Sequence, residues 1–322
     1  VIMTNVGTGY TSAPTVTIAA PPTPAGNTTA TAIGVPNLDQ ISSVATFSGR
    51  LWVSTGRTVT YSASTSPTDF TSVSAGAFTL ADSTLHNNIQ YMMSANNFLY
   101  VFGADSINVI SDVRISSTTG LTLYTNTNIS ASVGSDQPYA MMPYFRSIVF
   151  MNRYGVYALV GSTTSKISDA LDGLFPYIDF TKPVTGAQVM LNNILCAAFS
   201  FYYTGGSGTS SSNRYVQAVF FEKKWFFTDQ GSDIKWIWSA PVGGKINLYG
   251  TNGTNCVQLY SDSSSAINSY VQTALDPMKD PIRTKQATKI GVEATLTNAA
   301  QITVTVDSET GASPALVLGQ VI

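Results

Sequence analysis

Short apolar segments separated by polar turns recur along the middle of the chain. Five stretches share one pattern: a polar turn, an apolar strand, a Gly or Asn turn, and a second apolar strand. They are Ile41–Ser62, Ile89–Ser111, Tyr139–Gly161, Val189–Phe227 and Ile234–Ser261. Short runs of this kind, bounded by turn residues, are typical of β-strands. The pattern therefore predicts an all-β protein.

The five stretches recur at a nearly constant step. Their equivalent strand centres are separated by 48, 49, 47 and 51 positions, at Leu51, Leu99, Ile148, Leu195 and Ile246. Propeller blades repeat at roughly 40–50 residues, with about four short strands each. One such unit cannot bury its apolar face alone, so the units must pack together. We predict a β-propeller-like core of at least five blades; the alternative is a pair of β-sandwiches with evenly spaced hairpins.

The flanking regions differ from this core and suggest three parts. Residues 1–37 alternate Thr with apolar residues around a Pro-rich connection at Ala19–Asn27, and predict an N-terminal β-module or arm. Residues 38–275 form the propeller-like domain. Residues 276–322 begin with a charged, Pro-punctuated linker and end in a predicted hairpin, as a C-terminal β-module or closing blade. Because the chain begins at Val1 rather than Met, we expect a segment to precede it.

One weak helix signal interrupts the strands. Lys166–Gly173 lies between the third and fourth units, with Ser165 or Ser168 as a possible N-cap and Gly173 as the end. We predict a short helix between two blades.

Charge is scarce throughout the chain. Charged residues make up 11% of the sequence and the net charge is −2, whereas soluble domains average about 25% charged residues. A broad basic field for a phosphate backbone is therefore not expected, which argues against sequence-specific nucleic-acid binding. The adjacent pair Lys223 and Lys224 is interpreted as a solvated hairpin turn.

The cysteines and the apolar runs indicate no disulfide framework and no membrane span. Cys196 and Cys256 both lie in apolar, strand-like segments and are interpreted as buried free thiols, which fits a reducing compartment. The longest apolar runs, such as Ile194–Phe199 and Val216–Phe221, fall far short of the ~18 residues that a spanning helix needs. No signal peptide is visible.

Candidate catalytic groups are few. His86 is the single histidine, so clusters of histidines are impossible, and no Gly-x-Ser-x-Gly motif accompanies it. The acidic residues Asp169, Asp172 and Asp179 are close in sequence, but the first two suit the first turn of a helix. Gly205–Gly208 lacks the Lys-Ser/Thr of a phosphate-binding loop. We predict no catalytic residue, no cofactor and no metal site, and hence no enzyme.

Two further features were weighed as binding sites. Asp262–Ser265 and Asp307–Glu309 offer oxygen ligands for calcium, but neither has the full alternating ligand set. Trp236 and Trp238 could stack on a sugar, although aromatic side chains in strands are more often buried. The second feature leaves a carbohydrate-binding interpretation open.

Several motifs resemble those of the tail hub or nozzle proteins of short-tailed phages, also called packaged-DNA stabilisation proteins. A glycine-tyrosine segment at Gly7–Ile18 is similar to a β-module of phage structural proteins. The other motifs are Phe47-Ser-Gly-Arg-Leu-Trp-Val53, Val59-Thr-Tyr-Ser-Ala-Ser64, Pro67-Thr-Asp-Phe70, Asn97–Gly103, and Gly155–Gly161 with Lys166–Ser168. The resemblance covers most of residues 1–300.

The resemblance implies a structural protein of the virion, made in the host cytoplasm. Such a protein forms a homohexameric ring that extends the portal and adaptor channel, retains packaged DNA, takes part in DNA ejection, and anchors tail fibres or a needle. DNA passes through without sequence-specific binding. A surface poor in charge agrees with this expectation, because charged residues are depleted at the cores of interfaces.

Two alternatives belong to other classes. One is a carbohydrate-binding or glycan-cleaving propeller of a tail spike or secreted enzyme, which an exposed Trp236 and Trp238 would favour. The other is a host-encoded propeller scaffold that is monomeric in solution.

Overall fold

The computed structural model describes residues 41–81, 85, 87–205, 213–228 and 233–261, and four short strands between 302 and 318. Contacts divide the chain into two units, 1–261 and 262–322, each considered by itself. The described elements are β-strands apart from two three-residue 3₁₀ helices, so the all-β prediction is confirmed. The predicted N-terminal module, the linker and both predicted domain boundaries lie outside the described residues.

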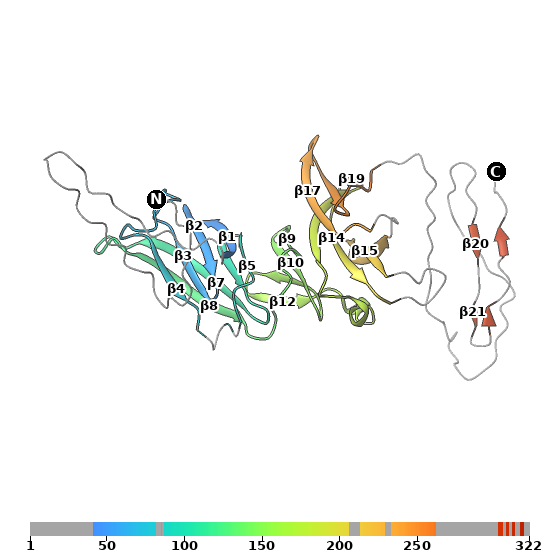
Figure 1. Ribbon diagram of the computed structural model, residues 1–322, viewed down its shortest axis with the longest axis horizontal. Helices are drawn as coiled ribbons and strands as arrows, with labels where there is room; N and C mark the ends of the chain where they lie inside the picture. The colour runs from blue at the N-terminus through green and yellow to red at the C-terminus, as the bar shows by residue number, and fades with distance from the viewer. Residues whose placement is uncertain are drawn as a thin grey trace, which may run out of the picture. The chain divides into compact units, whose positions relative to one another are not determined.

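The first unit contains five antiparallel sheets, A to E, in which strand order follows chain order (Figure 1). Sheet A contains β1 (Ile41–Phe47), β2 (Arg50–Thr55), β3 (Thr58–Tyr61) and β4 (Gly76–Thr79). Sheet B contains β5 (Tyr91–Ala95), β6 (Phe98–Phe102), β7 (Ile107–Ile115) and β8 (Thr122–Ser130). Sheet C contains β9 (Met141–Tyr144), β10 (Ser147–Asn152), β11 (Gly155–Val160) and β12 (Thr163–Lys166). Sheet D contains β13 (Thr185–Leu191), β14 (Ile194–Tyr203), β15 (Arg214–Phe221) and β16 (Lys224–Thr228). Sheet E contains β17 (Trp236–Val242), β18 (Lys245–Thr251) and β19 (Cys256–Leu259).

The predicted repeat matches the register of these sheets. Each of the five predicted centres is the second residue of the second strand of its sheet, from Leu51 in β2 to Ile246 in β18. A two-residue turn precedes that strand in every sheet. In four of them both turn residues have positive φ: Ser48–Gly49, Asn96–Asn97, Asn192–Asn193 and Gly243–Gly244. Such turns match the twist of the flanking strands and favour Asn and Gly, which explains the Gly and Asn signals of the sequence.

Four buried clusters lie between successive sheets. Trp52 and Tyr61 of sheet A pack with Met92 and Leu99 of sheet B. The other three clusters join B to C, C to D, and D to E. At the joint between B and C, the rings of Phe102 and Phe150 meet edge to face with centroids 5.3 Å apart.

Sheets B, C and D are therefore covered on both faces. In β6, Leu99 and Val101 face sheet A, whereas Tyr100 and Phe102 face sheet C. Successive side chains of a strand point to opposite faces, so a strand between two sheets must be apolar at every position. This is why the sequence of β6 is a continuous apolar run. Two separate β-sandwiches would leave each sheet covered on one face only, so this packing argues against the sandwich alternative.

The first strands of neighbouring sheets lie side by side. The backbone N–H of Met92 in β5 donates to Ser43 Oγ in β1 at 2.8 Å. In the same way, Ile237 in β17 donates its N–H to Thr185 Oγ1 in β13 at 3.2 Å. Each donor is the second residue of its strand, so the hydrogen bonds repeat with the sheets.

The row of sheets remains open over the described residues. None of the four buried clusters joins sheet A to sheet E, and the sheets neither close into a ring nor curl into barrels. The closed propeller therefore stays a prediction. In the second unit, β20 (Ile302–Val304) pairs with β23 (Leu316–Leu318), and β21 (Asp307–Ser308) pairs with β22 (Gly311–Ala312).

The predicted helix at Lys166–Gly173 is shorter than expected. The segment between sheets C and D contains only two 3₁₀ turns, η2 (Asp169–Leu171) and η3 (Phe175–Tyr177). Ser168 does not cap η2, because its buried Oγ accepts a hydrogen bond from the N–H of Val156 at 2.8 Å. The side chain that was predicted as a cap instead ties the connection to sheet C.

Candidate interaction surface

The Phe47–Val53 motif has a structural role. Arg50 is buried, and its Nη1 donates to the carbonyl oxygens of Ser62 and Ser74, both at 2.9 Å. The guanidinium lies 5.9 Å from the ring centre of Tyr61, and burial lowers its pKa. Trp52 donates its ring N–H to the carbonyl oxygen of Phe47 at 2.9 Å. Arg50 and Trp52 thus stabilise sheet A. An open depression lies beside this motif. It is lined by residues such as Thr46 and Asn97, and none of its lining residues is acidic.

The sequence-adjacent carboxylates do not assemble into a site. Asp172 forms an ion pair with Lys166, with 2.5 Å between oxygen and nitrogen. The carboxylate of Asp179 accepts hydrogen bonds from the N–H and hydroxyl of Thr181. Within the described ranges, no three His, Cys, Asp or Glu side chains are grouped as metal ligands would be. The carboxylates of Asp172 and Asp179 are thus satisfied by neighbouring residues.

Several candidate residues of the sequence lie in parts of the chain that the structure does not describe. His86, Gly206–Gly208 and Asp262–Ser265 lie outside the described residues, as does Glu309. Lys223 is described: it forms the exposed turn between β15 and β16 with Glu222, and Lys224 follows it. The interpretation of the lysine pair as a solvated turn is confirmed.

The two cysteines differ, and one prediction about them was wrong. Cys196 is buried between sheets D and E, as predicted, and burial raises the pKa of its thiol. Cys256 is exposed, because it lies on the last described strand of sheet E, on the face turned away from sheet D. The apolar run around Cys256 predicted burial without indicating that one face of this sheet lacks a neighbour.

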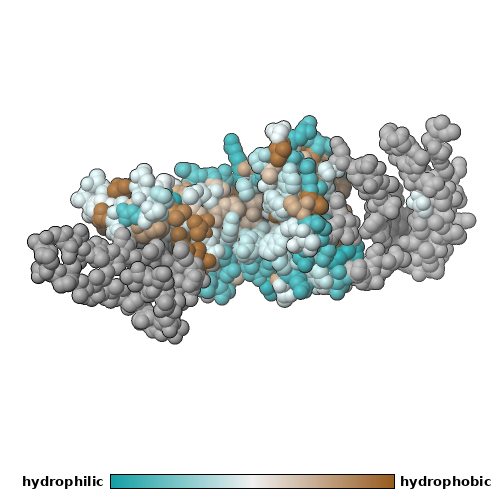
Figure 2. Space-filling view, turned by 45° about the horizontal axis from the view of Figure 1, so that its top comes forward, coloured by the Kyte–Doolittle hydropathy of each residue, from teal (hydrophilic) through white to brown (hydrophobic). Residues whose placement is uncertain are grey.

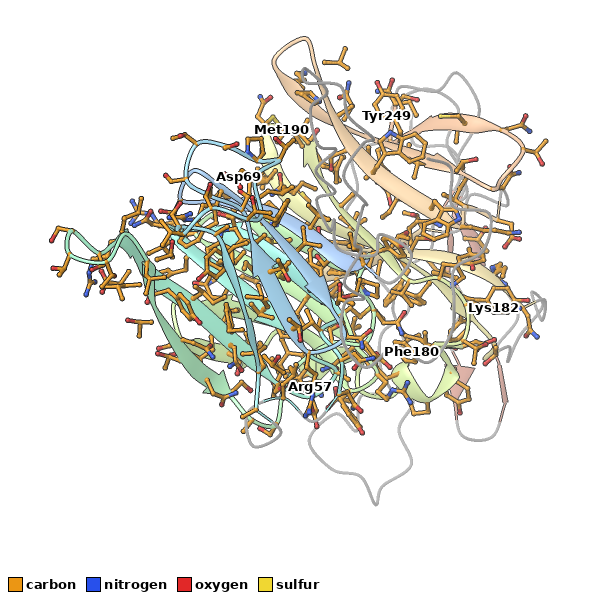
Figure 3. All side chains as sticks on the ribbon, turned by 60° about the vertical axis from the view of Figure 1, so that its left-hand side comes forward. Arg57, Asp69, Phe180, Lys182, Met190 and Tyr249 are labelled. Carbon is orange, nitrogen blue, oxygen red and sulfur yellow. The ribbon has the colours of Figure 1, made fainter. Side chains whose placement is uncertain are left out.

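That outward face of sheet E carries the candidate surface. Trp236 and Trp238 are 37% and 39% exposed, so the more common buried arrangement of strand aromatics does not apply to them. The ring of Trp238 stacks on Tyr249 of the neighbouring strand, with centroids 6.2 Å apart and 20° between the planes. Trp236 meets Tyr139 edge to face at 5.3 Å. Tyr249 is labelled on sheet E in Figure 3.

The polar surroundings of these rings are almost uncharged. Cross-strand pairing places Thr251, Cys256 and Gln258 on the same face as Trp238. Among the described strands of sheet E, Lys245 is the single charged residue, at the end next to the turn. Figure 2 shows apolar patches set among polar residues on the face in view. The surface suits contacts made by aromatic and amide groups rather than ion pairs.

The outward face of sheet A is the other end of the row, and no described sheet packs on it. It presents Val44 and Thr46 of β1, Leu51 and Val53 of β2, and Thr58 and Thr60 of β3. Val44 is 52% exposed, and Val53 alone of these six is buried. Arg50, the one charged residue in the strands of this sheet, points to the opposite face.

The fold and the surface together define a repetitive all-β protein with uncharged end faces. No protein-family model matches the chain, and a comparison with curated proteins gives no match. In the described part of the chain, no helix is long and apolar enough to cross a membrane.

Proposed function

We propose that the protein is a structural component of a phage tail, a hub or nozzle. In this role, copies of the chain form a ring that extends the portal and adaptor channel, retains packaged DNA, and anchors fibres or a needle. The sheets act as propeller-like blades, and they serve as rigid building blocks rather than as a catalytic scaffold. The proposal rests on the resemblance of the repeat motifs together with the open row of sheets.

The observation that carries the proposal is the pair of uncharged end faces on which no described sheet packs. A monomer in water gains solubility from surface charge, yet only 11% of the residues of this chain are charged. Interfaces between permanent partners favour aromatic residues and exclude lysine and glutamate from their centres. Sheet E, with Trp236, Trp238 and Tyr249 exposed beside one lysine, has that composition.

Low charge also suits a channel for DNA. Each phosphate contact made by Lys or Arg holds the duplex by counterion release, and many such contacts would retard its passage. A chain with 16 basic and 18 acidic residues provides no broad basic wall. In this role DNA moves past the protein without sequence-specific binding.

The test is assembly on the portal. The full-length protein is measured by mass photometry alone and after mixing with purified portal and adaptor rings encoded by the same genome. A ring of defined mass, or assembly that requires the adaptor, is expected; portal rings without adaptor are the control. A strict monomer with no affinity for either ring would contradict the proposal.

A second candidate function is carbohydrate binding at the same face. The specific observation is the half-exposed pair Trp236 and Trp238 flanked by Tyr139 and Tyr249, because exposed aromatic faces stack on sugar rings. A glycan array with the wild type and Trp236→Ala distinguishes it. Saturable binding of one glycan class that the variant loses would favour this candidate over the structural one.

A further inference from the structure

The sequence of β17 has the pattern of a strand covered on both faces. Trp236, Ile237 and Trp238 are apolar at three successive positions, so large apolar side chains point to both sides of sheet E. In sheets B, C and D, strands of this composition lie between two neighbouring sheets, as β6 and β10 do. In sheet E, Ile237 packs against sheet D, while Trp236 and Trp238 are exposed. Among the described residues, no sheet covers the side of sheet E that carries Trp236 and Trp238.

No described sheet packs on the opposite side of sheet A either. Its inward face packs on sheet B through Trp52, Val59 and Tyr61. Its outward face alternates Val44 and Leu51 with threonines, and Thr58 Oγ1 lies 2.9 Å from Thr79 Oγ1 on that face. Threonine and valine fit the pleated surface of packed sheets. The face holds no charge that would oppose burial against another sheet.

We propose that the outward face of sheet E binds the outward face of sheet A of a second copy of this chain. This inference rests on the proposed function and names the contact between neighbouring copies in the ring. A head-to-tail contact between two different faces propagates from copy to copy and closes when the rotation permits.

The internal joints of the chain are the argument for this pairing. We call the face of a sheet that looks toward the preceding sheet in the chain its leading face, and the face that looks toward the following sheet its trailing face. Each of the four joints packs the trailing face of one sheet against the leading face of the next, and none packs two trailing faces together. Sheet E ends the row with a trailing face, and sheet A begins it with a leading face. Packing E on A of the next copy repeats the same joint. It covers Trp236 and Trp238 without burying an unpaired carboxylate, because neither face contains one.

Two charged substitutions separate this contact from the other arrangements. Trp238→Asp blocks the face of sheet E, and Val44→Asp blocks the face of sheet A; like charges prevent the two blocked faces from pairing. Tyr154→Asp is the matched control, because Tyr154 is 70% exposed on sheet C, away from both end faces. Circular dichroism checks that all three variants fold.

The expected results concern mass in sedimentation velocity. Wild type and Tyr154→Asp form the same oligomer, whereas each end-face variant alone sediments as a 34.2 kDa monomer. An equimolar mixture of the two end-face variants forms a dimer and nothing larger, because one intact E face meets one intact A face. The mixture also shows that both variants are folded.

The reactivity of Cys256 in the wild-type protein reports on the same contact. Cys256 lies on the face of sheet E that the second copy would cover, and Cys196 is buried in either state. Maleimide labelling of Cys256 is expected to slow as the protein concentration rises and the oligomer forms. In Trp238→Asp, labelling is expected to stay fast at every concentration.

Other outcomes overturn the inference. A wild type that is monomeric at all concentrations, with Cys256 always reactive or always protected, would exclude contact between copies at this face. An oligomer lost in Trp238→Asp but kept in Val44→Asp would indicate two E faces packed together. Rings that form on the adaptor with both end-face variants would keep the proposed function and refute this contact. Head-to-tail oligomers with no affinity for the adaptor would support the contact between sheets E and A and refute the proposed function.

Discussion

Phe150 offers the sharpest test of the stacked sheets. Its side chain is fully buried at the joint of sheets B and C, edge to face with Phe102 and stacked on Tyr157 at 5.7 Å. Truncation to Ala removes both ring contacts and leaves a cavity between two sheets whose backbones are fixed by their own hydrogen bonds. Phe150→Ala is therefore expected to lower the free energy of unfolding by about 3–5 kcal/mol.

A matched control lies five positions earlier in the same sheet. Phe145 occupies the β9–β10 turn and is 72% exposed, although its ring touches Tyr144. Phe145→Ala is expected to change the stability by no more than about 0.5 kcal/mol, as is usual for surface substitutions. The two variants remove the same atoms, so their difference measures burial alone.

The assay is urea denaturation followed by tryptophan fluorescence and far-ultraviolet circular dichroism. With a slope of about 3 kcal/mol per molar urea, Phe150→Ala shifts the midpoint by about 1 M or more. Because neighbouring sheets stabilise each other in a linear array, the loss of one joint can also split the transition into two steps. If Phe150→Ala and Phe145→Ala are equally stable, sheets B and C are not packed as described.

Three further predictions concern single side chains. Asp69 accepts hydrogen bonds from the turn that follows it, which lowers the pKa of its carboxyl to about 2. The carboxylate therefore stabilises the turn above the unfolded pKa of about 3.9, and this stabilisation is lost as the pH falls towards 2. A carboxyl-detected NMR titration measures the pKa of Asp69. Burial raises the pKa of Tyr260 to about 12, although its hydroxyl pairs with Thr228 at 2.8 Å. The stability that it contributes is complete below about pH 10 and is lost as the pH rises through 12. The difference between the absorbance titrations of the wild type and Tyr260→Phe is expected to be one tyrosine that ionises near pH 12; a missing step near pH 10 would show that Tyr260 is exposed. Cys196 is expected to resist alkylation until the protein unfolds, and rapid labelling at native conditions would show that sheets D and E are not in contact.

The sequence predicts the register of the repeat well because of local chemistry. Asn and Gly at the first turn of most sheets mark where the chain must adopt positive φ, and the apolar residue two positions after the turn, such as Leu99 or Leu195, is fixed by that turn. The fourth strands were harder to recognise. β12, with the sequence Thr-Thr-Ser-Lys, lies at a sheet edge and contributes little to the core, so no hydrophobic pattern identifies it.

The candidate surface was not predictable from the same signals. Trp236 and Cys256 lie in apolar strands. The apolar composition of a strand indicates that its side chains favour burial, but it does not indicate whether another part of the same chain packs on them. The order of the described sheets reveals that one of them, sheet D, packs on one side of sheet E. The predicted helix failed for a related reason, since the hydroxyl of Ser168 is used by a neighbouring strand rather than by its own segment.

The two-sheet joints have a consequence for how such a chain can change in length. Each of the four buried clusters joins one sheet to the next in chain order, and each joint uses residues from one repeat and the next. Duplication of one repeat of about 48 residues within the gene would insert a complete sheet between two compatible faces. Loss of a fraction of a repeat would instead leave a strand without its partner. The row can therefore lengthen or shorten during evolution in steps of one sheet, while its two end faces stay the same.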